Sequence, residues 1–217
     1  MPENPTADLL PTEAPATEAP ASEATSNEAA SASNPFPVHT TESASPAARR
    51  AMAATVKHLG YLPAPVARLA SSPQLLEGFL KLNGIFETTT LDPLAREVLI
   101  MTITTHNGCH VCVAMHTAAL TSMGADAGLI TALRDRQPVQ DPRLEALRLF
   151  TLEVLATAGA VGDGPLKAFL ASGYTTQNAL EVVLGIGVYT MSTLANRLTR
   201  APLDEQLKPF AWDGPAA

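Results

Sequence analysis

Aromatic side chains and cysteines are scarce in this sequence, and long uninterrupted hydrophobic runs are missing from it. Only 5% of the 217 residues are aromatic although 46% are hydrophobic, so the core has to be built from aliphatic side chains and methionine, which fill layers of packed helices. No window approaches the roughly 18 consecutive apolar residues of a membrane span. We therefore expect no membrane-spanning segment and no membrane partner.

Positive charge is also scarce. The chain has 14 lysines and arginines against 21 aspartates and glutamates, which gives a formal net charge of −7. A nucleic-acid surface needs clustered basic side chains, whereas these are spread along the whole chain. The composition therefore argues against nucleic acid as a partner and favours small molecules or proteins.

The sequence contains no clear export signal. Its first residues show no basic segment followed by an apolar run, which is the pattern of a secretory signal. The arginine pair at 49–50 resembles part of a twin-arginine signal, but the run that follows is short and contains Lys57 and His58. Two cysteines three residues apart close too small a loop to staple a secreted domain. We expect a cytoplasmic protein.

Residues 1–46 form a tract of Pro, Ala, Thr, Glu and Ser with almost no large apolar side chain. Such a tract cannot bury enough surface to offset the entropy of ordering, so we expect it to be a disordered tail. Residues 47–217 are long enough for one sizeable helical domain.

From residue 47 onward, segments of helical length alternate with stop signals, and alternating strand patterns are absent. This predicts an all-α, multi-helix bundle. Proline preceded by serine or aspartate favours a helix start, because the first turn needs no proline N–H and the preceding side chain can cap free N–H groups. The predicted helices cover about residues 73–87, 93–105, 109–123, 127–133, 142–158, 163–171 and 175–198.

The last of these segments is apolar on nearly every side between Ala179 and Leu194. A helix of this kind is either central in the fold or buried against another subunit.

Both cysteines and three of the five histidines lie within residues 96–117. Cys109 follows the Asn107-Gly108 break, so it should stand in the first turn of a helix, where unpaired N–H groups and the helix dipole favour an anion. Helix N-termini and CxxC motifs can lower a cysteine pKa from about 8.5 to roughly 3.5–7.5. Cys112 and His116 follow on the same helical face. The spacing suits a reactive thiol pair with an imidazole nearby.

Glu97 is a candidate partner for this histidine. If the chain folds back near residue 107, Glu97 and His116 lie at similar heights on neighbouring antiparallel helices. A carboxylate can orient a histidine and raise its basicity, so the two form a plausible proton relay to Cys112.

Other interpretations of the same residues stay open. The two cysteines could be buried structural side chains in a non-catalytic helical module, and Glu97 could be a solvated helix charge. The cysteines and His116 could also supply three of four zinc ligands, with His106, His110 or Glu97 as the fourth. Covalent haem is excluded, because Val113 stands where that motif needs a histidine. His39 and His58 look like ordinary surface or loop residues.

The combined spacing resembles that of the carboxymuconolactone decarboxylase and alkylhydroperoxidase D-like superfamily: Glu97, eleven residues, Cys109-x-x-Cys112, three residues, His116. The similarity covers most of residues 60–212. It implies an all-helical fold that assembles as a homo-trimer or homo-hexamer. In the peroxidase branch it implies thiol-dependent reduction of hydroperoxides. We expect a small organic hydroperoxide as substrate and a dithiol or thiol-protein as reductant, and we expect no cofactor or metal.

Carried over by position, the resemblance assigns a role to each motif residue. Cys112 is the thiol that becomes a sulfenic acid. Cys109 donates a proton and resolves that acid to a disulfide, while His116 and Glu97 form the relay. One position departs from the peroxidase pattern, which has a histidine where Val111 stands. The adjacent histidine does not replace it, because one residue turns a helix by about 100°.

The decarboxylase branch implies a different reaction, the conversion of a lactone acid to an enol-lactone in aromatic catabolism. That chemistry needs no cysteine pair. The presence of Cys109 and Cys112 therefore favours the redox reaction, with a lyase as the alternative.

Overall fold

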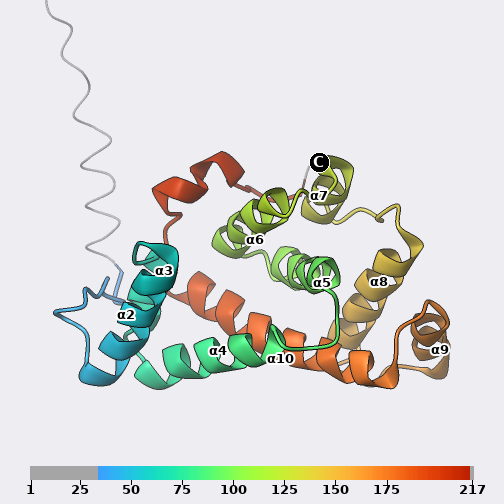
Figure 1. Cartoon of the computed structure of the whole chain (residues 1–217), viewed down its shortest axis with the longest axis horizontal. Coiled ribbons are helices and arrows are strands. Elements are labelled where there is room, and N and C mark those ends of the chain that lie inside the picture. The colour runs from blue at the N-terminus through green and yellow to red at the C-terminus, as the bar shows by residue number, and fades with distance from the viewer. Residues whose placement is uncertain (1–33, 216–217) are drawn as a thin grey trace, which may run out of the picture. The chain divides into compact units, whose positions relative to one another are not determined.

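The computed structural model describes residues 34–215, and these residues form helices and turns without any β-strand (Figure 1). The prediction of an all-α bundle is confirmed. The prediction of a disordered tail falls mostly on residues 1–33, which lie outside the described part of the chain.

Residues 34–215 contain nine α-helices and a final 3₁₀ helix, joined by turns and short connecting segments. They are α2 (Pro46–Leu59), α3 (Ala64–Leu69), α4 (Pro73–Phe86), α5 (Pro93–His106), α6 (His110–Ser122), α7 (Ala127–Arg134), α8 (Pro142–Ala156), α9 (Asp163–Ala171), α10 (Thr176–Leu198) and η1 (Glu205–Phe210).

The helix starts follow the local capping signals. The side chain of Asp92 accepts a hydrogen bond from the Ala95 N–H at 2.8 Å, and a proline occupies the first position of α5. Equivalent side-chain caps precede α4, α7 and α8 at Ser72, Asp126 and Asp141. These oxygens satisfy N–H groups that have no partner within the helix. The predicted starts of these helices are confirmed.

The compact helical unit begins at Phe36, before the expected boundary at residue 47. Ala44 is buried, the His39 N–H donates to the Ala67 carbonyl at 3.1 Å, and the Arg68 guanidinium donates to the Phe36 carbonyl. The segment before α2 therefore packs on the helices rather than continuing the tail. The arginine pair at 49–50 lies within α2.

Helix α5 lies in the middle of the unit and packs against α6, α7, α8 and α10 (Figure 1). Its side chains are buried without interruption over residues 98–105, so it has no polar face toward solvent there. The polar members of this run are threonines, and the Thr102 and Thr105 hydroxyls donate to carbonyls one turn back in α5. This pairing lets polar side chains occupy a dry core.

Helix α10 is the one helix within residues 34–215 that is long and apolar enough to cross a membrane by composition alone. It nevertheless packs against α3, α4, α5 and α8, and it buries the polar side chains of Asn178, Glu181 and Asn196. These contacts give the helix a central position, the first of the two placements expected for it. The high hydropathy arises because its uncovered side is also apolar, with exposed side chains at Leu180, Val183, Leu194 and Leu198.

Candidate active site

The candidate site is built on the hairpin formed by α5 and α6. Gly108 has a φ of +67°, in the left-handed region that a side chain rarely adopts, and this residue reverses the chain. The next N–H, of Cys109, donates to the Thr104 carbonyl at 3.1 Å. The turn therefore brings the start of α6 directly against the end of α5.

Cys109 caps α6 rather than standing inside its first turn. Its Sγ accepts a hydrogen bond from the Cys112 N–H at 3.4 Å. The two cysteines are joined as a disulfide, with their Cα atoms 5.4 Å apart. Cys109 is 1% exposed and Cys112 is 5% exposed. A sulfur at the N-cap also faces the free N–H groups of the helix, which favour a thiolate once the pair is reduced.

Glu97 and His116 meet across the hairpin. Nδ1 of His116 lies 2.9 Å from Oε2 of Glu97, and both side chains are largely but not fully buried. The expected contact between neighbouring antiparallel helices is therefore present. Because Glu97 engages Nδ1, it fixes the orientation of the ring and leaves Nε2 as the nitrogen available for proton transfer.

Tyr189 of α10 supports this imidazole. Its ring packs edge-on against His116, with the ring centroids 5.5 Å apart. Its hydroxyl donates to Oδ1 of Asn83 in α4 at 2.8 Å. Burial raises the pKa of Tyr189, and the nearby carboxylates of Glu87 and Glu97 raise it further, so the hydroxyl stays a neutral donor.

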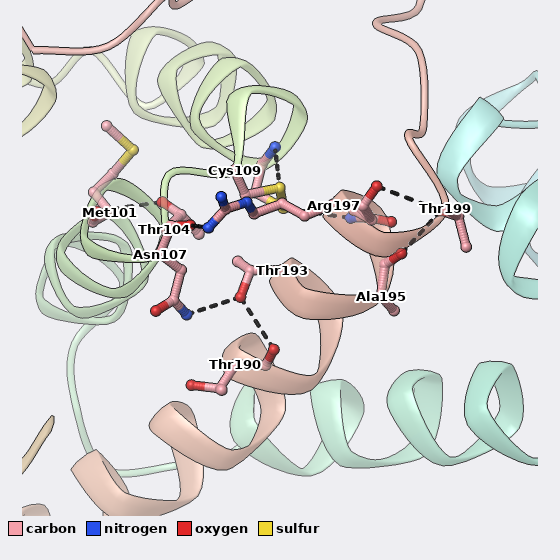
Figure 2. The surroundings of a disulfide bond; sticks show 11 residues. Met101, Thr104, Asn107, Cys109, Thr190, Thr193, Ala195, Arg197 and Thr199 are labelled. Carbon is pink, nitrogen blue, oxygen red and sulfur yellow. Dashed lines mark hydrogen bonds between the residues drawn. A yellow bond between two sulfur atoms is a disulfide. The ribbon is translucent and has the colours of Figure 1, made fainter. Parts of the chain in front are cut away.

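The end of α10 is tied to the hairpin turn. The Asn107 side-chain amide donates to the Thr193 hydroxyl at 2.8 Å, and the Arg197 guanidinium donates to the Asn107 carbonyl. Figure 2 shows these side chains between α10 and the turn that carries Cys109. On the same stretch of α10, Nδ2 of Asn196 lies 3.3 Å from Sγ of Cys112.

A cavity of about 450 Å³ opens beside Cys112 but does not include Cys109 among its lining residues. This volume suits a small organic molecule. The apolar part of the lining comes mainly from α2, α3, α4 and the segment between α2 and α3, and includes Leu59, Pro63, Pro65, Val66, Leu69, Phe79, Leu80 and Met115. The polar part includes Thr55, His58, Asn83, Glu87, His116, Tyr189, Ser192 and Asn196.

His58 therefore needs a different interpretation from the one its sequence context suggested. It is exposed, as expected of a surface residue, but it also lines the cavity together with Cys112 and His116. It takes this place because the C-terminal end of α2 contributes to the cavity wall. His39 remains outside the cavity and hydrogen bonds to Ser71 at 3.2 Å.

The remaining motif positions lie away from the cavity. His106 and His110 are exposed at the ends of α5 and α6, and neither lines the space beside Cys112. Val111 is buried against both cysteines and Ala201.

Within residues 34–215, no group of three or more His, Cys, Asp or Glu side chains is placed to hold a metal ion.

Asn196, Tyr189 and Asn83 were not predicted from the sequence. They belong to no short motif, and Asn196 is 84 residues from the cysteine that it contacts. Only the packing of α10 and α4 on the hairpin brings them to the site.

The profile of the carboxymuconolactone decarboxylase family matches residues 73–153, which include Glu97, both cysteines and His116. Over this segment the chain is similar to the carboxymuconolactone decarboxylase family. Comparison with curated protein sequences gives no significant match.

Several solved structures have the same fold as this chain. A protein from Ralstonia eutropha JMP134, described as an alkylhydroperoxidase AhpD core and an uncharacterized peroxidase-related protein, superposes with a TM-score of 0.72 at 17% identity, covering 80% of this chain and 94% of that one. A peroxidase-related protein from Silicibacter sp. TM1040 gives a TM-score of 0.66 at 16% identity, covering 80% and 92%. The debrominase Bmp8 gives 0.61 at 15% identity, covering 76% and 90%.

The segment that the family profile matches extends from α4 into α8. The thiol pair and the Glu97–His116 pair lie inside it. Helices α2, α3 and α10 lie outside it; α2 supplies His58 to the cavity, α3 supplies Val66, and α10 supplies Tyr189 and Asn196. The wall that faces a ligand is therefore largely made by parts of the chain beyond the matched segment.

Proposed function

We propose that this protein is a thiol-dependent peroxidase that reduces small organic hydroperoxides through the Cys109–Cys112 pair. The observation that carries the proposal is that Cys112, but not Cys109, lines the same cavity as His116, whose ring is held by Glu97. A thiol that faces a small-molecule cavity next to an oriented base has the surroundings of an attacking nucleophile.

In the first half-reaction, Nε2 of His116 takes the proton of the reduced Cys112 thiol. The thiolate attacks the terminal oxygen of the hydroperoxide, an S–O bond forms, and the O–O bond breaks with its electron pair leaving on the alkoxide. Cys112 is thereby oxidised to a sulfenic acid, and the Cys109 thiol protonates the alkoxide to an alcohol.

In the second half-reaction, the Cys109 thiolate attacks Sγ of Cys112. The S–S bond forms and the S–O bond breaks, and the departing hydroxide takes the proton from His116 to leave as water. The product is the disulfide that joins the two cysteines in the structure. An external dithiol or thiol-protein then reduces this disulfide and restores both thiols.

The lining of the cavity supports an organic rather than a highly charged substrate. Much of the wall is aliphatic or aromatic, and its polar groups include Cys112 and His116. An apolar wall favours the organic part of a hydroperoxide through burial of its hydrocarbon surface. It also excludes water, which strengthens the charge interactions of the thiolate.

The experiment is a stoichiometric oxidation of the reduced protein. Protein freed of reductant is mixed with cumene hydroperoxide, and free thiols and cumyl alcohol are counted. We expect two thiols to disappear for each hydroperoxide converted to alcohol, and Cys112→Ser to abolish the conversion. Retention of both thiols in the presence of excess hydroperoxide would contradict the proposal.

A second candidate is a lactone decarboxylase or related lyase, and the matched family profile favours it. The Glu97–His116 pair could transfer a proton to or from a bound lactone acid without using sulfur. The two functions are separated by a Cys109→Ser, Cys112→Ser double variant assayed with a carboxymuconolactone. Lyase activity that survives in this variant would support the second candidate.

A further inference from the structure

Asn196 occupies a distinctive position in the cavity. It is 5% exposed, it lines the cavity, and its Nδ2 lies 3.3 Å from Sγ of Cys112. Its other amide atom, Oδ1, is buried and has no hydrogen-bond partner within residues 34–215. An acceptor buried in this way is costly unless a donor reaches it, so its place in a ligand cavity points to a donor on the ligand.

The backbone of α10 is held where this side chain projects. Thr193 and Arg197, one turn before and one residue after Asn196, both contact Asn107 in the hairpin turn. These contacts fix the end of α10 against the segment that carries the cysteines. The amide is therefore presented to Cys112 by a rigid support rather than by a loop.

The Asn196 amide gives Cys112 an uncharged hydrogen-bond donor, unlike the titratable side chains of the cavity. The titratable side chains of the cavity are His58 on α2, Glu87 after α4, His116 on α6 and Tyr189 on α10, with Glu97 on α5 behind His116. Lysine and arginine are absent from the lining residues. An amide N–H is uncharged and donates at every pH, and such a bond is stronger to a thiolate than to a thiol.

Val111, which stands where the peroxidase pattern has a histidine, has no polar side-chain group to donate to Cys112. It is buried with the two cysteines and Ala201 and does not line the cavity. The donor to Cys112 comes instead from α10, through a residue far away in the sequence.

We propose that Asn196 is a catalytic residue of the peroxidase reaction, and this inference rests on the proposed function. Its Nδ2–H donates to the Cys112 thiolate and lowers the pKa of that thiol. Its Oδ1 accepts the hydrogen bond of the terminal O–H of the hydroperoxide, which aligns that oxygen with the sulfur. The substrate class is therefore a peroxide that carries a free O–O–H group.

The test uses Asn196→Leu, which keeps the approximate size of the side chain and removes both amide groups. In a Cys109→Ser background, the pH dependence of iodoacetamide alkylation reports the pKa of the Cys112 thiol. We expect Asn196→Leu to raise this pKa by about one unit, the order expected for loss of a hydrogen bond to a charged group. Gly187→Ala, which adds a methyl group on α10 outside the cavity where no atom lies within 4 Å, should leave the thiol pKa unchanged.

A second measurement tests the contact with the hydroperoxide. At a pH where the thiol is ionised in both proteins, we expect Asn196→Leu to form the sulfenic acid with cumene hydroperoxide at least tenfold more slowly. An unchanged thiol pKa overturns the contact with the thiolate, and an unchanged rate overturns the contact with the hydroperoxide. Alkylation needs no peroxide, so failure of the peroxidase proposal would be recognised separately.

If Asn196→Leu does not fold, as judged by circular dichroism, Asn196→Asp replaces it. Its carboxylate has the same size as the amide and repels the thiolate, so the Cys112 pKa should rise by more than one unit. A thiol pKa that is unchanged in Asn196→Asp overturns the proposal.

Discussion

Nδ1 of His116 lies 2.9 Å from Oε2 of Glu97, although the two residues belong to different helices of the hairpin. This contact makes His116 a candidate base, because the carboxylate holds Nδ1, fixes the orientation of the ring and leaves Nε2 available for proton transfer. Tyr189 packs on the same ring from α10. The imidazole is thus held from two sides while it faces the cavity.

The first prediction concerns this pair. His116→Ala should slow sulfenic acid formation with cumene hydroperoxide by about 100-fold or more at neutral pH, the usual contribution of a positioned acid or base. Glu97→Gln should slow it by a smaller factor, because the ring remains but loses the charge of its partner. Rapid-mixing measurement of thiol loss gives the rates. Rates in both variants equal to that of the unchanged protein would remove the relay from the mechanism.

The second prediction concerns the packing of α10 on α5. A Cβ atom added at Gly185 would lie 2.5 Å from Cδ2 of Leu99 and 2.9 Å from Cε2 of Phe86. Gly185→Ala should therefore destabilise the protein by about 1–3 kcal/mol, as overpacking does. At Gly84 in α4 no atom lies within 4 Å of an added Cβ, so Gly84→Ala should be neutral or stabilise by up to about 1 kcal/mol. Denaturant unfolding of both variants measures the difference, and equal effects would contradict this account of the helix contact.

The third prediction concerns pH and Glu181. Burial raises the pKa of this carboxyl, but hydrogen bonds from Thr90, Asn178 and Gln177 outweigh burial and hold the pKa below its ordinary value. A lowered folded-state pKa stabilises the protein above the unfolded-state pKa of about 4.3, and this contribution is lost as the pH falls through the folded-state value.

Melting temperatures at several pH values test this. At pH 7 the unchanged protein should melt above Glu181→Gln, and the gap should shrink as the pH falls below about 4.3. Glu153→Gln, on α8, serves as the control and should show no such trend. A gap between the unchanged protein and Glu181→Gln that widens on acidification would have the wrong sign.

The fourth prediction concerns assembly, which we propose to be a homo-trimer or homo-hexamer. Helix α10 exposes Leu180 by 72%, Leu194 by 55% and Leu198 by 69%, in a stripe that the described residues of one chain do not cover. Covering such a stripe with a second copy removes apolar surface from water. Light scattering should give three or six times the mass of one chain.

Leu194→Glu should lower that mass, while Val38→Glu, at an exposed apolar residue outside the stripe, should not. A monomeric unchanged protein would contradict the proposed assembly without affecting the chemistry of the thiol pair.

The sequence predicts those parts of the structure that depend on local signals. The start of α5 could be predicted because Asp92 and Pro93 act on the next few residues of the same chain segment. The meeting of Glu97 with His116 could be predicted because a short turn fixes the relative heights of two adjacent helices.

The rest depends on tertiary packing that leaves no local signal. Asn196 reaches Cys112 only because α10 crosses the hairpin, and His58 reaches the cavity only because α2 forms part of its wall. The early start of the helical unit likewise depends on Arg68 and Ala67 binding the segment that precedes α2. Each of these contacts joins residues that are far apart in the sequence.

The central claim is that Cys112 is the sulfur that attacks the peroxide. It is tested most directly by treating reduced Cys109→Ser protein with one equivalent of cumene hydroperoxide in the presence of dimedone and locating the adduct by peptide mass spectrometry. The account predicts a dimedone adduct on Cys112, and its absence from Cys112→Ser protein treated in the same way. A Cys112 that stays unmodified while the hydroperoxide is consumed, or an adduct on Cys109 in the Cys112→Ser protein, would contradict it.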